Sequence, residues 1–166
     1  MTSGSRAEPQ WLSPDEQAIW RDWLAVTSLL PAALQRALHA DAGLSLPDFD
    51  VLVLLSETDG GRLRVSELAR ALTWERSRAS HHLSRMEKRG LVAREECEDD
   101  GRGWFVVLTA AGRDALERAV PGHVDTVRSL FLDPLPAGGD TGLADALAAL
   151  RTGLERSVTN DRIPPR

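Results

Sequence analysis

The sequence lacks the features that several classes of protein require. Cys97 is the one cysteine among 166 residues, which excludes an intramolecular disulfide framework and a zinc site with two or more thiolates. No stretch approaches the roughly 18 consecutive apolar residues that span a bilayer, and residues 1–10 lack the basic and then apolar order of a signal peptide. No nucleophile, base and orienting acid stand at a recognisable spacing. We therefore expect a cytoplasmic protein without membrane contact, which is not an enzyme and holds neither metal nor cofactor.

Cys97 is also a poor candidate for a redox sensor. Its neighbours include Glu95, Glu96, Glu98 and Asp99. Their negative charge disfavours the thiolate, which is the form that oxidants attack. We expect this thiol to have no regulatory function.

The chain lacks net positive charge, yet its basic residues are unevenly distributed. Lys and Arg number 20 against 25 Asp and Glu, for a net charge of -5. Residues 62–94 contain nine basic and three acidic residues, whereas the rest of the chain contains 11 basic and 22 acidic residues. A basic module within an acidic frame indicates that this segment meets an anion. The competing interpretation is a chance cluster of solvated arginines.

Start signals divide the first third of the chain into two helices. Ser13-Pro14-Asp15-Glu16 has the form of a capping box, and an apolar stripe from Ile19 to Leu38 follows it. Pro31 is expected to kink or split this helix. Ser45-Leu46-Pro47-Asp48 repeats the signal, and residues 49–55 are apolar on too many sides for a surface helix. The second helix is therefore expected to lie buried at the centre of the fold.

The middle of the chain has the pattern of a helix-turn-helix. Gly60-Gly61 predicts a turn, which leads through a short extended segment to Ser66 as the cap of a helix. A second helix follows a connection at Thr73-Trp74. Two short helices joined in this way pack across each other and expose the polar face of the second.

Two extended runs follow the second of these helices. LVAREEC and WFVVLT, residues 91–97 and 104–109, flank a glycine-containing loop, which is typical of a β-hairpin. A hairpin directly after a helix-turn-helix is a wing. Arg102 at the tip lies between glycines and is placed to enter a narrow minor groove, where the negative potential is enhanced. Asp100 is placed to hold this arginine in position.

The last third of the chain predicts further helices. Thr109 is expected to cap the next helix, and Pro121-Gly122 to interrupt it. A loop over residues 133–142 leads to a last helix, whose apolar seam is Leu143, Leu147, Leu150 and Leu154. So narrow a seam suits contact between helices, either within one subunit or between two. Residues 1–12 are expected to be disordered and residues 158–166 to be frayed.

The segment Thr73 to Val92 gathers two histidines with serines and basic residues. Neighbours on a helix point about 100° apart, so His81 and His82 cannot grip one metal ion. The edge expected to face inward consists of Ala79, Leu83 and Met86. The opposite side presents donors that suit base edges and phosphates in a major groove. The candidate DNA contacts on this helix are Ser77, Arg78, Ser80, His81, His82, Arg85 and Lys88. At the helix ends, the side chains better placed for phosphates are Arg76, Lys88 and Arg89.

Three segments together resemble the multiple-antibiotic-resistance regulator (MarR) family. They are SLPDFDVL at 45–52, RMEKRGLV at 85–92, and the wing with the VLTAAGR that follows it at 107–113. The resemblance runs from about Asp15 to Leu154. It implies a homodimeric winged helix-turn-helix regulator, usually a repressor, that binds palindromic double-stranded operator DNA.

The resemblance also implies an architecture, namely a mainly α fold with a small β wing. One unit, residues 13–157, would contain dimerisation helices within 13–44 and 110–157. Residues 45–109 would form the winged helix-turn-helix part that binds DNA.

Two tryptophans of the first helix raise the question of a ligand. Family members often accept an aromatic or anionic effector between the dimerisation and DNA-binding parts, and Trp20 or Trp23 is a candidate wall for such a pocket. Core or interface packing of these rings is the alternative. From a different functional class, the competing candidate is a winged-helix protein-interaction module whose basic face meets an acidic protein.

Overall fold

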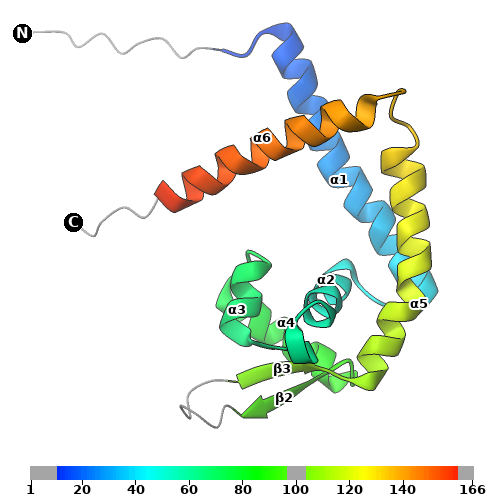
Figure 1. Ribbon diagram of the computed structural model, residues 1–166, viewed down its shortest axis with the longest axis vertical. Helices are drawn as coiled ribbons and strands as arrows, with labels where there is room; N and C mark the ends of the chain where they lie inside the picture. The colour runs from blue at the N-terminus through cyan, green and yellow to red at the C-terminus, as the bar shows by residue number, and fades with distance from the viewer. Residues whose placement is uncertain (1–10, 97–103, 161–166) are drawn as a thin grey trace, which may run out of the picture. The chain divides into compact units, whose positions relative to one another are not determined.

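The computed structural model describes residues 11–96 and 104–160, with side chains up to residue 157. The chain divides into two compact units, Met1–His123 and Val124–Arg166. The first unit contains, in order, α1 (Pro14–Ala42), α2 (Leu46–Ser56), a short 3-10 turn (Asp59–Gly61), β1 (Arg62–Arg64), α3 (Val65–Ala71), α4 (Arg76–Lys88), β2 (Val92–Glu96), β3 (Trp104–Leu108) and most of α5 (Ala110–Val127) (Figure 1). The second contains the end of α5, a π-helical turn (Arg128–Leu132) and α6 (Gly139–Asn160). The predicted fold class, mainly α with a small β wing, is confirmed.

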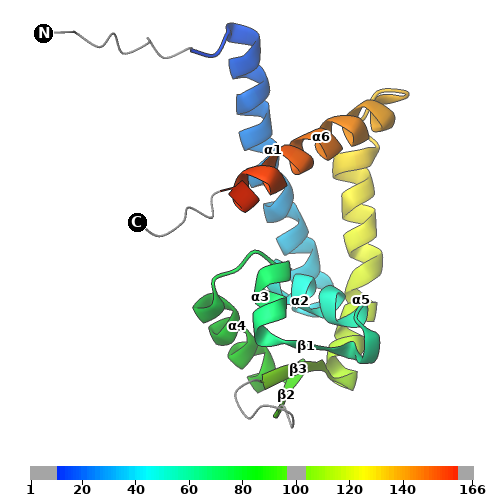
Figure 2. The ribbon, with the colours of Figure 1, turned by 60° about the vertical axis from the view of Figure 1, so that its left-hand side comes forward.

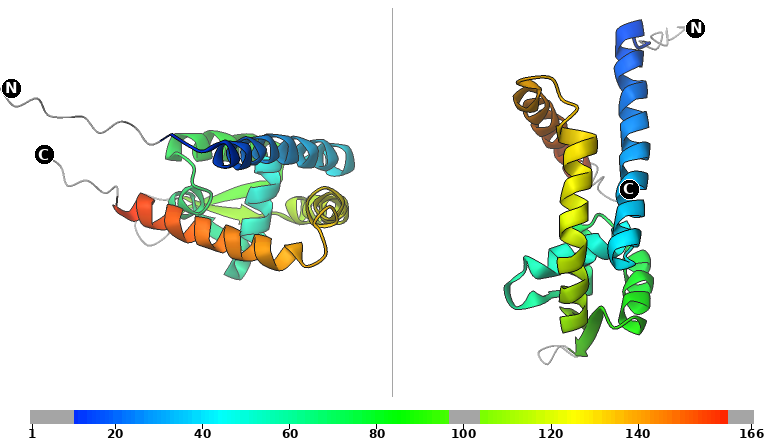
Figure 3. Two further views of the ribbon diagram at one scale, coloured as in Figure 1. Left: turned by 90° about the horizontal axis from the view of Figure 1, so that it is seen from above. Right: turned by 90° about the vertical axis from the view of Figure 1, so that its right-hand side faces the viewer.

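α1 begins at the predicted capping box. Ser13 Oγ accepts from the amide of Glu16 at 3.2 Å, and the Glu16 carboxylate accepts from the amide of Ser13 at 2.7 Å. The helix then runs 29 residues through Pro31 without division (Figure 3). The prediction that Pro31 splits it was wrong, because a proline removes one helical hydrogen bond while the bonds on both sides hold the helix. Pro121 likewise lies inside α5 and does not interrupt it.

α3 begins two residues earlier than its sequence indicated. Its N-cap is Arg64, whose amide donates to the Glu67 carboxylate at 3.2 Å. Ser66 therefore lies within the first turn and is not the predicted cap. At this helix start the free amide of Arg64 is satisfied by Glu67, three residues after the cap, and not by Ser66.

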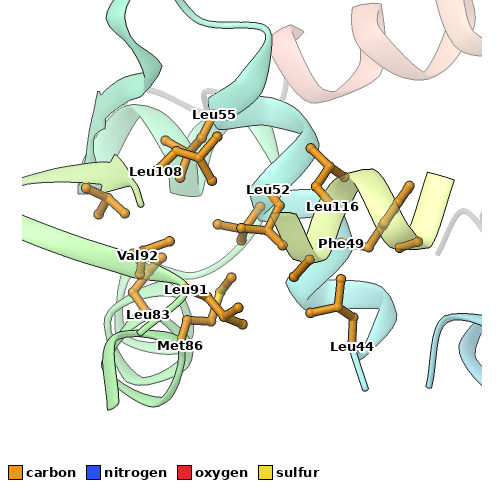
Figure 4. Close-up of a cluster of buried hydrophobic side chains, with 14 of the residues drawn as sticks. Leu44, Phe49, Leu52, Leu55, Leu83, Met86, Leu91, Val92, Leu108 and Leu116 are labelled. Atoms are coloured by element: carbon orange, nitrogen blue, oxygen red, sulfur yellow. The ribbon is translucent and has the colours of Figure 1, made fainter. Parts of the chain in front are cut away.

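α2 forms the centre of the first unit, as its apolar run predicted. Val51, Leu52 and Leu55 have no exposed surface. Figure 4 shows Leu52 and Leu55 among side chains from α4, both wing strands and α5. Burial of most of its surface explains why this helix is mainly apolar, with Asp50 and Ser56 as its exposed polar side chains.

The sheet is antiparallel with the order β1-β3-β2 (Figure 2). β3 pairs with β2 from Val92 opposite Leu108 to Glu96 opposite Trp104, and it pairs with β1 on its other side. The predicted hairpin is thus present, with β1 as a third strand. The tip of the wing, including Cys97, Asp100 and Arg102, lies outside the described residues.

Thr109 and Gly112 join the start of α5 to the turn after α4. Thr109 Oγ1 donates toward the carbonyl oxygens of Gly90 and Leu91, at 2.7 and 3.0 Å, and accepts from the amide of Gly112 at 3.0 Å. The predicted cap is therefore confirmed. A Cβ on Gly112 would stand 2.1 Å from the Leu91 carbonyl oxygen. Only glycine permits this close approach of two backbones.

The second unit carries the leucine seam on α6. Leu143 and Leu147 are half-buried, whereas Leu150 and Leu154 are exposed. α6 begins at Gly139, inside the predicted loop, and stays helical to Asn160. Residues 1–10 and 161–166 lie outside the described residues.

Candidate nucleic-acid interface

α4 exposes a basic face above an apolar edge. Ala79, Leu83 and Met86 have no exposed surface, which confirms the predicted orientation of the helix. The exposed candidates on this helix are Ser77, Arg78, His81, Arg85 and Lys88, and Ser80 is half-buried. No acidic residue lies in the first turn of the helix. This face therefore presents the donors that an anionic surface requires.

His82 is buried, and its predicted place on the exposed face was wrong. Its exposed fraction is 8%. It stands three residues after Ala79 and four before Met86, so helical geometry puts it on the same inward stripe as these residues. The spacing already carried this information, but the polar character of the residue suggested the opposite.

Asp48 is the partner that allows a polar ring to be buried here. This carboxylate, only 2% exposed, lies 3.1 Å from His82 Nε2 and accepts from Arg89 Nη1 at 2.6 Å. It also caps α2 by accepting from the amide of Ser45 at 2.9 Å. Burial by itself would raise the pKa of Asp48, but its contacts with His82 and Arg89 outweigh burial and hold the pKa well below its usual range.

Arg89 has a structural role. Besides Asp48, its guanidinium donates to the carbonyl oxygen of Gly43 at 2.9 Å. Gly43 is the left-handed C-cap of α1. One arginine therefore ties the end of α4 to the junction between α1 and α2.

Arg94 holds α4 from the opposite side. From β2 its Nη2 donates to Ser84 Oγ at 2.7 Å and to the carbonyl oxygen of Ser80 at 3.1 Å. Its Nε lies 3.5 Å from the Glu87 carboxylate. α4 is thus braced by α2 and by the wing, which fixes the direction of its exposed face.

Trp74 organises the start of the same helix. The Arg78 guanidinium lies 4.7 Å above the centre of its ring, and the His82 ring meets it edge-on at 5.3 Å. A cation above an indole face is attracted by the ring's quadrupole. Trp74 therefore orients an exposed arginine at the position where α4 would approach an anion.

Basic side chains also lie on the sheet. Arg62 and Arg64 stand over the Phe105 ring at 4.7 and 5.5 Å from its centre. Arg62 is also 3.9 Å from the Glu95 carboxylate. β1 thus carries positive charge next to the helix-turn-helix.

A surface cavity of about 310 Å³ opens beside α2. It is lined by Phe49, Asp50, Val53, Leu54, Glu57, Leu72 and His123. Phe49 and His123 stack with ring centres 4.4 Å apart. Burial raises the pKa of Asp50 and lowers that of His123. Trp20 and Trp23, which are 52% and 42% exposed on α1, do not line this cavity.

Across residues 11–96 and 104–160, no three His, Cys, Asp or Glu side chains are grouped so that they could hold a metal ion. None of the helices described there combines the length and apolarity needed to cross a membrane.

The braced basic helix, the turn before it and the hairpin after it define a winged helix-turn-helix DNA-binding protein. The family model for the MarR family matches residues 42–103. The chain is 32% identical over 123 residues to the helix-turn-helix transcriptional regulator YfiV of Bacillus subtilis. The aligned region covers 73% of this chain and 74% of YfiV. The chain belongs to the MarR family of transcriptional regulators.

Solved structures show the same relationship. Sco3205 of Streptomyces coelicolor, a MarR family regulator solved in complex with DNA, has a TM-score of 0.82 and 40% identity over 88% of this chain and 92% of its own. AbsC, a MarR family regulator of the same organism, has a TM-score of 0.82 and 41% identity, with 89% of this chain and 99% of AbsC covered. The chain is accordingly a DNA-binding transcriptional regulator and not an enzyme.

Proposed function

We propose that this protein is a cytoplasmic, homodimeric repressor that binds a palindromic operator and leaves it when a small molecule binds. The observation that carries the proposal is α4, whose exposed basic face is fixed in direction by Asp48 on one side and Arg94 on the other. A helix of this kind enters a major groove. The proposed DNA contacts are Ser77, Arg78, Ser80, His81, Arg85 and Lys88 on α4, with Asp100 and Arg102 at the wing tip.

Exposed apolar side chains support the proposed dimer. Ile19 and Leu29 on α1 are 70% and 69% exposed, and Leu154 on α6 is 65% exposed. So many large apolar groups in water indicate surfaces that another chain covers. We assign dimerisation to helices within 13–44 and 110–157 and DNA binding to 45–109. A dimer would place its two α4 helices about 34 Å apart, which is one turn of DNA.

Loss of Arg78 and Arg85 tests the DNA-binding face. An operator is first selected from random duplexes. The double variant Arg78→Ala with Arg85→Ala is then expected to bind it roughly 100-fold more weakly, since each good base contact contributes about 1–3 kcal/mol. The salt dependence should also become less steep, because fewer counterions are released. Fluorescence anisotropy at several salt concentrations measures both effects, and the stoichiometry should be two chains per duplex.

Arg151→Ala is the matched control for these variants. Arg151 lies in the second unit, and its side chain pairs with Glu155 in full contact with solvent. Its loss should leave DNA affinity unchanged. If the Arg78 and Arg85 variants also bind normally, α4 is not the reading surface, and an acidic protein becomes the better candidate partner. Arg102→Ala examines the wing separately.

We further propose that the effector is a small aromatic compound. The cavity beside α2 offers a stacked Phe49–His123 pair as an apolar wall and the Asp50 and Glu57 carboxylates as polar anchors. These carboxylates favour a neutral or cationic aromatic ring over an anion. Leu72, at the end of α3, also lines the cavity, so an occupant would touch the helix-turn-helix itself.

Tryptophan fluorescence can report on the effector. A compound that binds this cavity is expected to weaken operator binding roughly tenfold, within the usual range of allosteric coupling, and to leave the fluorescence of Trp20 and Trp23 unchanged, because neither ring lines the cavity. Quenching that disappears in Trp20→Phe or Trp23→Phe but persists in Trp104→Phe would place the compound at the two α1 rings instead of in the cavity. A panel of aromatic acids and bases that neither quenches nor releases DNA would contradict the proposal.

A further inference from the structure

His82 lies between a buried carboxylate and an exposed arginine. Its Nε2 is 3.1 Å from Asp48 Oδ1, and its Nδ1 is 3.0 Å from Arg85 Nη2. Nε2 makes no hydrogen bond there, so the contact with Asp48 is electrostatic. The ring thus touches one group from α2 and one from the exposed face of α4.

The chemistry of the two partners determines where the proton of His82 resides. A guanidinium has only donors. Nδ1 must therefore offer a lone pair to Arg85, and the ring proton belongs on Nε2, facing the carboxylate. The contact with Arg85 thus selects this tautomer, and an N–H on the side of the carboxylate is also electrostatically favourable.

The ring itself has little freedom to move. Trp74 meets it edge-on, and Asp48 is held in turn by Arg89 and the amide of Ser45. These contacts extend from the start of α2 through His82 to the Arg85 guanidinium. An exposed arginine normally loses many rotamers when it binds, whereas Arg85 already has a fixed acceptor on its own helix.

We propose that His82 is a positioning residue that sets the direction of Arg85 and thereby the base pair that Arg85 reads. This inference rests on the proposed function, in which Arg85 contacts the operator. His82 itself touches no DNA. Its effect on sequence preference is indirect, through the guanidinium that its Nδ1 holds, while its effect on general DNA affinity is small.

A double-mutant cycle at each operator base pair tests the inference. Arg85→Ala should lower discrimination at one base pair by roughly tenfold, the usual size for a direct arginine contact. His82→Phe, which keeps the ring and its contact with Trp74, should lower discrimination at the same base pair by roughly fivefold. The double variant should be no worse than Arg85→Ala, because the two residues act through one contact. His39→Phe, the same change at an exposed histidine of α1, should leave discrimination at that base pair intact.

Two polar variants separate positioning from packing. In His82→Asn the amide oxygen stands near the place of Nδ1 and can still accept from Arg85. In His82→Gln the longer chain reaches toward Asp48 and leaves Arg85 without an acceptor. Asparagine is expected to retain most of the discrimination and glutamine to lose it. Equal behaviour of these two variants, measured at matched folded fractions, would overturn the proposal even if His82→Phe failed to fold.

The failures of the two proposals are distinguishable. If the wild-type protein selects no operator, the proposed function is wrong. If it selects one and the effects of His82→Phe and Arg85→Ala add, or fall on different base pairs, DNA reading stands and His82 has a structural role only.

Discussion

Replacing Asp48 with alanine is expected to lower the free energy of unfolding by about 3 kcal/mol at neutral pH. The change removes the charge that Arg89 and His82 face, and it removes the cap of α2 at Ser45. Breaking a buried ion pair from one side costs about 3–5 kcal/mol. The lower figure applies because the Arg89 side chain is 44% exposed and can be solvated. Urea denaturation measures the loss.

The pH dependence of the isosteric variant Asp48→Asn isolates the charge. The pKa of Asp48 is held below its usual range, so the stabilisation that its charge provides is fully present above about pH 4, the ordinary pKa of an aspartate. It is lost as the pH falls from there toward the lower pKa of the folded protein. The stability difference between wild type and Asp48→Asn should therefore be constant near neutrality and narrow in acid.

Asp50→Asn on the same helix is the control. Burial raises the pKa of Asp50, so its charge is disfavoured in the folded protein near neutral pH. Its replacement should leave stability unchanged or raise it. A gap between wild type and Asp48→Asn that is as wide at pH 3 as at pH 7 would show that shape rather than charge explains the loss.

Replacing Gly112 with alanine should destabilise the protein by about 3 kcal/mol, at the upper end of the range for overpacking. The added Cβ would meet a backbone oxygen, that of Leu91, and no rotamer change can relieve the clash. α5 and the turn after α4 must then separate, which strains the Thr109 contacts with Gly90 and Leu91. The midpoint of thermal unfolding reports the loss.

Gly153→Ala provides the same chemical change without the clash. Gly153 lies inside α6, and a Cβ there would have no neighbour within 4 Å. Since alanine is the better helix former, this variant should gain about 0.5–1 kcal/mol. Equal midpoints for the two variants would contradict the close approach at Leu91.

Local signals predicted most of the elements because those signals act over a few residues. The capping boxes at Ser13 and Ser45 and the cap at Thr109 are present as expected. The prolines are the exceptions. Pro31 and Pro121 each remove one hydrogen bond, but helices of 29 and 18 residues continue through them, since the cooperative ladder on both sides outweighs a single missing bond.

The partners of the arginines could not be predicted from the sequence. Arg85, Arg89 and Arg94 look alike in the sequence, yet Arg89 is tied to Asp48 and Arg94 to Ser84. Arg89 and Asp48 are 41 residues apart in the chain. No periodicity or spacing connects residues at that distance, so the partners became visible only when α2 and α4 packed together.

The sequence by itself determined the helix-turn-helix, the wing hairpin, the central apolar helix and the inward edge of α4, because capping, turn chemistry and periodicity depend on near neighbours. The spacing of His82, three residues from Ala79 and four from Met86, also indicated the inward stripe, although its polar character led to the opposite prediction. Only the tertiary structure decided that a histidine could stay there. A polar ring can be buried only where another element supplies a partner, and that partner, Asp48, comes from a helix distant in the sequence.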